Sequence, residues 1–178
     1  MSGSDRIRLF CALQLPADVV EVLAGWQAEH LRAGRVVPAE NLHVTLAFLG
    51  SRPQADMSAI EHELAEAAAG AGSVRLLARR YRETGSVGMI VFDDVGGTGS
   101  ALAAELGLRL QALGLYRRER RPWLPHVTVT RFRERPRLDP PLPALGEFDV
   151  VRSALYSSTL RPAGARYDVL ESVALGGR

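Results

Sequence analysis

The stretch His43-Val44-Thr45-Leu46 occurs a second time, nearly unchanged, as His126-Val127-Thr128-Val129. Side chains alternate between the two faces of an extended strand, so each copy places its histidine and threonine on one face and its two aliphatic residues on the other. A single His-x-Thr in an apolar strand means little, because a lone strand histidine is most often a surface or satisfied core residue. Two copies in one small chain indicate a paired site, in which two strands turn polar faces to a cleft and apolar faces to the core.

The composition is that of a globular protein, with 47% hydrophobic and 24% charged residues. The sequence contains no run of about 18 apolar residues, so it predicts no membrane span. Residues 1–6 lack the basic start and apolar core of a signal peptide. The only cysteine, Cys11, lies in an apolar run, which excludes an intramolecular disulfide and predicts a buried, inert thiol. We expect a cytoplasmic monomer with no obligate protein partner and no membrane association.

All of the 22 Lys and Arg residues are arginine. The planar guanidinium group suits bidentate contact with phosphate, which weakly favours a phosphate-bearing substrate, although genome composition explains the bias equally well. The cluster Arg117-Arg118-Glu119-Arg120-Arg121 leads directly into Pro122-Trp123-Leu124-Pro125 and the second motif. This cluster is interpreted either as a surface that steers nucleic acid or as a solvated loop.

The apolar patterns predict an alternating order of strands and helices around the two motifs. The predicted strands cover 7–15, 42–50, 74–81, 87–92, 124–132, 148–157 and 165–173, and the predicted helices cover about 17–31, 56–69 and 100–113. This order predicts an α+β fold over residues 1–178, a single bilobal domain whose two pseudo-symmetric lobes flank a central cleft. In each lobe we expect an antiparallel sheet with outer helices, and the helix before each motif strand should belong to the half of that strand.

If the two motif faces meet across the cleft, two imidazoles and two hydroxyls converge. Histidine exchanges protons near neutral pH, so one copy can act as a general base while the other acts as a general acid. Neutral hydroxyl donors suit the oxygens of a phosphate. This set of groups can open a phosphodiester without a metal.

Two other chemistries fit the residues less well. A catalytic zinc site usually has three protein ligands, and no Asp or Glu recurs in the two motifs to act as the third. A serine hydrolase would need a Gly-x-Ser-x-Gly elbow, which is missing, and would leave the repetition unexplained.

The segment 37–50, with its Pro38-Ala39-Glu40-Asn41 lead into the first motif, resembles the two-histidine phosphoesterases. More narrowly, it is similar to the bacterial and archaeal RNA 2',3'-cyclic phosphodiesterases, once called 2'-5' RNA ligases. Further similar stretches are found at 8–13, 121–131, 155–160 and 165–170, so the resemblance spans nearly the whole chain.

The resemblance implies an enzyme that hydrolyses RNA ending in a 2',3'-cyclic phosphate to a 2'-phosphate end. The paired histidines and threonines predict that it does so without a metal or cofactor. In the reverse sense, it implies joining of RNA ends through a 2'-5' bond. His43 would then protonate the departing 3'-oxygen and His126 would activate water, while Thr45 and Thr128 would hold the phosphate oxygens. The near symmetry of the motifs allows the acid and base labels to be exchanged.

Four further residues are candidates for substrate binding. Arg131 matches a basic family position after the second motif and could pair with the phosphate, and Phe48 stands where the family often has an aromatic residue. Strict alternation nevertheless places both on the core face of their strands. Trp123 and Tyr167 are candidates for stacking on a base, with ordinary packing as the other interpretation.

Two alternative functions stay open from the sequence. One is a phosphodiesterase that acts on small cyclic-phosphate nucleotides, and the other is a catalytically weak protein that binds RNA ends.

Overall fold

The computed structural model describes residues 5–176 and contains three α-helices and nine strands within that range. Residues 1–4, most of the segment on which the signal-peptide prediction rests, lie outside the described residues. The helices are α1 (Ala17–His30), α2 (Met57–Ala69) and α3 (Thr98–Ala112), with short 3-10 turns η1 (Ala39–Asn41) and η2 (Gln54–Asp56). The strands are β1 (Arg6–Gln14), β2 (Arg35–Val36), β3 (His43–Pro53), β4 (Val74–Glu83), β5 (Val87–Val95), β6 (His126–Arg131), β7 (Glu147–Val150), β8 (Arg152–Arg161) and β9 (Gly164–Ala174).

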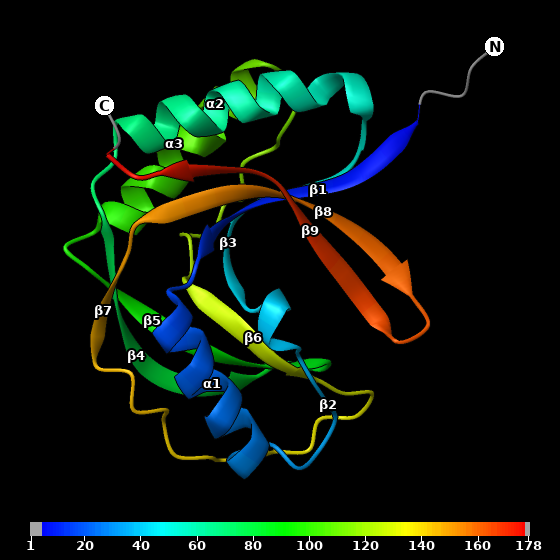
Figure 1. The fold of residues 1–178 in the computed structure, drawn as a ribbon, viewed down its shortest axis with the longest axis vertical. Helices are drawn as coiled ribbons and strands as arrows, with labels where there is room; N and C mark the ends of the chain where they lie inside the picture. The colour runs from blue at the N-terminus through cyan, green and yellow to red at the C-terminus, as the bar shows by residue number, and fades with distance from the viewer. Residues whose placement is uncertain (1–4, 177–178) are drawn as a thin grey trace.

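The strands form one strongly curled antiparallel sheet in the order β7-β4-β5-β6-β3-β1-β8-β9, with β2 paired to β6 (Figure 1). The two motif strands, β3 and β6, lie side by side at the middle of this order. They are paired only at Val44 and Val127, the aliphatic residue that follows each motif histidine. This single point joins β3, β1, β8 and β9 on one side to β6, β5, β4, β7 and the short β2 on the other, and the predicted α+β fold is confirmed.

The expectation that each helix packs on the half of its own motif strand is wrong for α1. This helix precedes β3, yet it packs against the half that contains β4, β5 and β6 (Figure 1). The reason is a buried polar anchor, because the side-chain amide of Gln27 donates hydrogen bonds to the carbonyl oxygens of Val37 and of Val129 in β6. A buried amide needs such partners, and only the second half provides the β6 carbonyl.

Strand β1 is buried on both faces, with one face in the main core and the other beside the first motif. Leu9, Cys11 and Leu13 belong to the main hydrophobic core, whereas Phe10 and Ala12 belong to a second, small cluster with residues of β8. The predicted burial of Cys11 is confirmed, and burial raises the pKa of its thiol to about 12, which keeps it protonated. The second cluster forms an aromatic floor beside the first motif.

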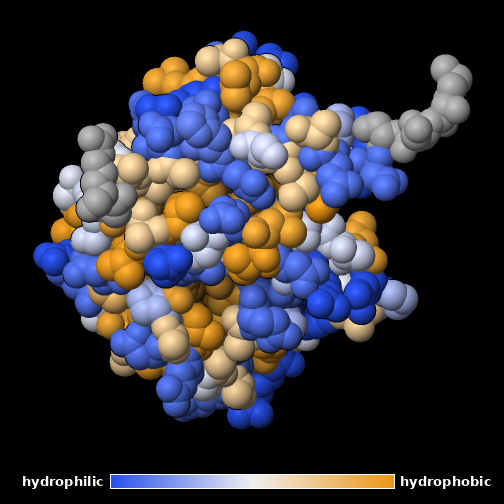
Figure 2. Space-filling model, turned by 45° about the horizontal axis from the view of Figure 1, so that its top comes forward, coloured by the Kyte–Doolittle hydropathy of each residue, from blue (hydrophilic) through white to orange (hydrophobic). Residues whose placement is uncertain are grey.

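On the face shown in Figure 2, hydrophobic residues occur in small patches among hydrophilic ones. Within residues 5–176, no helix combines the length and the apolar character that crossing a membrane requires.

Candidate active site

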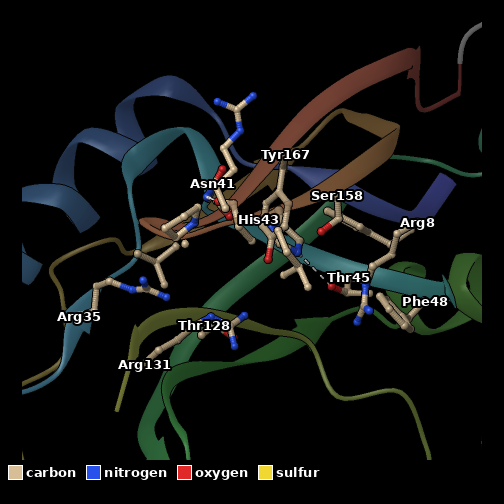
Figure 3. A pocket seen from close by; sticks show the side chains of 17 residues that line it. Arg8, Arg35, Asn41, His43, Thr45, Phe48, Thr128, Arg131, Ser158 and Tyr167 are labelled. Carbon is tan, nitrogen blue, oxygen red and sulfur yellow. Dashed lines mark hydrogen bonds between the residues drawn. The ribbon is translucent and has the colours of Figure 1, made fainter. Parts of the chain in front are cut away.

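A cavity of about 510 Å³ lies between the two halves of the sheet. It brings together six of the eight residues that the sequence proposes for the site: His43, Thr45, Phe48, Thr128, Arg131 and Tyr167. In Figure 3, His43 and Tyr167 lie on one side of this cavity, and Thr128 and Arg131 extend from β6 below them. The convergence of the two motif strands is therefore present in the structure.

Both motif histidines are held by the same local contact. The Nδ1 atom of His43 lies 2.7 Å from the carbonyl oxygen of Asn41, and Nδ1 of His126 lies 2.8 Å from that of Leu124, in each case two residues earlier in the chain. A carbonyl oxygen only accepts hydrogen bonds, so Nδ1 carries the proton and Nε2 is the ring atom free for proton exchange. The Thr45 hydroxyl lies 3.1 Å from Nε2 of His43.

Strict alternation fails in the same place in both motif strands. In β3, Ala47 and Thr45 pair with consecutive residues of β1, so Leu46 between them has no partner in β1. In β6, Thr130 and Thr128 pair with consecutive residues of β5, so Val129 between them has no partner in β5. Such a β-bulge adds one residue to a strand and reverses the faces of the residues beyond it.

The two bulges bring Phe48 and Arg131 to the cavity. Each is the second residue after the bulged one, and both are exposed and line the cavity, although alternation alone places them in the core. Phe48 is 48% exposed, and the guanidinium group of Arg8 lies 4.9 Å from its ring centroid. The two residues therefore occupy equivalent places in the two halves of the site.

The ring of His43 lies in an aromatic pocket. Its centroid is 4.8 Å from that of Phe10 and 5.3 Å from that of Tyr167, which meets it edge to face. Burial among these rings is the main cause that lowers the pKa of His43 to about 4, and electrostatic interaction with His126 and Arg131 lowers it further. The carbonyl of Asn41 acts in the opposite direction but does not outweigh burial. His43 is thus neutral at pH 7 when the cavity holds no anion.

This environment makes a prediction about the titration of His43. In the free protein, we expect its imidazole to titrate near pH 4, and inorganic phosphate should raise that pKa because a bound anion stabilises the imidazolium. Histidine ring NMR signals followed against pH, with His43→Gln to assign the signal, measure both values. A His43 signal that titrates near the ordinary histidine pKa of about 6.5 without phosphate, or that is insensitive to phosphate, contradicts this prediction.

The other two proposed residues lie next to a second hollow. His126 and Trp123 line a neighbouring cavity of about 810 Å³ that shares Thr45 and Phe48 with the first. The indole nitrogen of Trp123 donates a hydrogen bond of 2.9 Å to the carbonyl oxygen of Thr45, so this side chain links the second half to β3. Trp123 is half-buried, and its ring approaches Gly99 of α3 closely enough that a Cβ there would lie 2.7 Å from it.

The structure adds residues to the site that were not found from the sequence. Asn41 holds His43 through its carbonyl, and its side-chain amide donates to the carbonyl oxygen of Ala165, which connects the motif to the start of β9. Phe10 forms the floor. Three more arginines line the first cavity, namely Arg8, Arg35 and Arg161. The high arginine content of the sequence is the one feature that indicates these arginines, and it does not predict which of them line the same cavity.

Within residues 5–176, no group of three or more His, Cys, Asp and Glu side chains is placed to hold a metal ion.

Comparison with known proteins places this geometry in a family. A family model described as LigT like Phosphoesterase matches residues 13–83. The RNA 2',3'-cyclic phosphodiesterase of Escherichia coli strain K12 is 33% identical, over 97% of this chain and 98% of that protein. The chain belongs to the LigT-like phosphoesterase family. A relative from Thermus thermophilus, also named RNA 2',3'-cyclic phosphodiesterase, is 34% identical over 96% of this chain and 91% of its own length.

Solved structures of LigT-like phosphoesterases share the fold described above. Escherichia coli LigT in complex with 3'-AMP superimposes with a TM-score of 0.83 at 26% identity, covering 97% of this chain and 100% of that one. A protein of Thermus thermophilus gives a TM-score of 0.82 at 29% identity, covering 96% of this chain and 99% of that one. The predicted membership of this family and the predicted fold class are both confirmed.

Proposed function

We propose that this protein hydrolyses RNA ends that carry a 2',3'-cyclic phosphate and produces 2'-phosphate ends without a metal or cofactor. The observation that carries the proposal is the paired arrangement of His43 and His126, each fixed through Nδ1 so that Nε2 is the atom that exchanges protons, next to Thr45 and Thr128. The names of the relatives from Escherichia coli and Thermus thermophilus support the same activity.

The charges around the first cavity favour a phosphate-bearing substrate. Arg8, Arg35, Arg131 and Arg161 line it, and none of the described residues that line it is acidic. None of these four arginines forms an ion pair with a carboxylate in the part of the chain that the structure describes. A concave site with uncompensated positive charge concentrates and holds anions.

In the proposed reaction, a water oxygen attacks phosphorus while the bond from phosphorus to the 3'-oxygen breaks. His126 accepts the proton of the water, and His43 donates a proton to the departing 3'-oxygen. Thr45 and Thr128 donate hydrogen bonds to the non-bridging phosphate oxygens, where charge is held in the transition state. After the reaction, the phosphate remains on the 2'-oxygen and the two histidines have exchanged protonation states.

The low pKa of His43 places a condition on its role as the acid. In the empty cavity the imidazole is neutral, so it must gain a proton when the anionic substrate binds. The phosphate charge supplies the required shift, because an opposite charge within a few ångströms favours the imidazolium form. The acid role of His43 therefore depends on substrate binding.

The activity is tested by incubating the protein with an excess of chelator and an oligonucleotide that ends in a 2',3'-cyclic phosphate. We expect full conversion to the 2'-phosphate product, identified by its mass and by its retention of a free 3'-hydroxyl. Intact ends, or a requirement for added metal, would overturn the proposal.

The same assay separates the two alternative functions. Preference for a 2',3'-cyclic mononucleotide over the oligonucleotide in direct competition would favour an enzyme for small nucleotides. Binding of the cyclic end without turnover would favour an RNA-end-binding protein.

We also propose that the protein acts in the cytoplasm as a monomer, with RNA as its partner. The buried free thiol of Cys11 agrees with a reducing compartment.

A further inference from the structure

The second cavity has a composition that differs from the first. It lies between β3, α3 and the segment that leads into β6, and its lining includes His126, Trp123 and Tyr116. The two cavities meet at Thr45 and Phe48, and His43 lines only the first whereas His126 lines only the second. The reaction centre therefore has a hollow on each side, one for each histidine, and the two hollows adjoin at Thr45 and Phe48.

The lining of the second cavity suits a nucleic acid strand. Arg82, Arg118 and Arg121 contribute three positive charges against the single negative charge of Glu119, and none of these arginines forms an ion pair with a carboxylate within the described residues. Trp123 and Tyr116 add half-buried aromatic surface. Positive charge that follows a backbone, combined with aromatic side chains for stacking, is typical of sites for single-stranded nucleic acid.

The geometry of phosphoryl displacement indicates which RNA strand the second cavity would bind. The attacking and leaving oxygens lie roughly in line on opposite sides of phosphorus. In the proposed function, on which this inference rests, His43 faces the leaving 3'-oxygen, so the ribose with the cyclic phosphate occupies the first cavity. The attacking oxygen then enters on the side of His126, where the second cavity lies.

We propose that the second cavity binds an RNA strand with a free 5'-hydroxyl, the nucleophile in 2'-5' joining. The 5'-oxygen forms a bond to phosphorus as the bond to the 3'-oxygen breaks, His126 accepts the 5'-hydroxyl proton, and His43 protonates the 3'-oxygen. The product is a 2'-5' diester with a free 3'-hydroxyl. Cleavage of that diester runs through the same groups in reverse and releases the 5'-hydroxyl strand from the second cavity.

The test replaces Arg118 and Arg121 together by glutamine, and the matched control replaces their neighbours Arg117 and Arg120, which are exposed but line neither cavity. The first readout is the Kd for a labelled 5'-hydroxyl oligonucleotide, measured by fluorescence anisotropy in saturating inorganic phosphate, which we expect to fill the first cavity. We expect the Arg118 and Arg121 pair to raise this Kd by about 100-fold, or about tenfold for each charge-assisted contact, and the control pair to raise it less than about threefold.

The second readout is hydrolysis of a 2',3'-cyclic mononucleotide and of a cyclic-ended oligonucleotide. Both rates should stay within about twofold of the unmodified protein, while joining of the two strands falls with the lost affinity. A Kd that is unchanged, or changed equally by the control pair, overturns the inference. A loss in oligonucleotide hydrolysis alone also overturns it, because the second cavity would then hold the upstream part of the cyclic-ended strand. Failure of the unmodified protein to hydrolyse either substrate would count against the proposed function instead.

Discussion

Replacement of either motif histidine by glutamine should lower kcat for a 2',3'-cyclic end by roughly 10²–10⁴-fold. Glutamine keeps much of the volume and hydrogen bonding of the imidazole but cannot exchange a proton near neutral pH. The loss should be similar for His43→Gln and His126→Gln, and the double variant should be little worse than either, because the two groups act in one step. Initial rates at saturating substrate, with product separated by chromatography, measure these effects.

The matched control for this pair is His62→Gln, since His62 is an exposed residue of α2 that lines neither cavity. It should leave kcat unchanged. Either motif variant retaining a rate within about tenfold of the unmodified protein would contradict paired acid-base catalysis.

A modified substrate distinguishes the two histidines. A cyclic phosphate with sulfur in place of the 3'-oxygen has a leaving group that departs without protonation, because a thiol has a pKa near about 8.5, far below that of an alcohol. We expect this substrate to restore most of the rate of His43→Gln and little of the rate of His126→Gln. The opposite pattern would exchange the acid and base roles.

The alternation of side chains is sufficient to predict which residues of each motif face the site, but it fails at the second residue after each motif. His43, Thr45, His126 and Thr128 face the cavities as the strand pattern predicts. Phe48 and Arg131 face the first cavity only because bulges at Leu46 and Val129 reverse the pattern. Leucine and valine are ordinary strand residues, so nothing in either residue type marks a bulge. The bulge is visible only in the pairing with the neighbouring strand.

Residues that reach the site by long-range packing could not be predicted from the sequence for a related reason. Asn41 acts through its backbone carbonyl, which every residue possesses, and through an amide contact with Ala165 at the far end of the chain. The packing of α1 on the second half depends in the same way on Gln27 meeting Val129 in β6. Local patterns predict which elements form, whereas these contacts depend on how distant elements meet.

The two motif threonines give the other large expected effect. Thr128→Val removes a hydroxyl from the cavity while keeping the shape of the side chain, and we expect kcat to fall by roughly 10²–10³-fold, as when one donor to a developing negative charge is lost. Thr45→Val should cost a similar factor. The serine variants of both residues retain the donor and should recover most of the rate.

The control here is Thr159→Val, an exposed threonine of β8 that lines neither cavity. If Thr128→Val raised KM alone and left kcat unchanged, its hydroxyl would bind the substrate and the transition state equally. The proposed role of Thr128 requires the hydrogen bond to strengthen as charge develops on the phosphate oxygen, so the loss must appear in kcat. A matching loss for Thr45→Val, with no larger loss from its contact with Nε2 of His43, agrees with equivalent donors from the two halves of the sheet, as their equivalent bulges and histidine contacts imply.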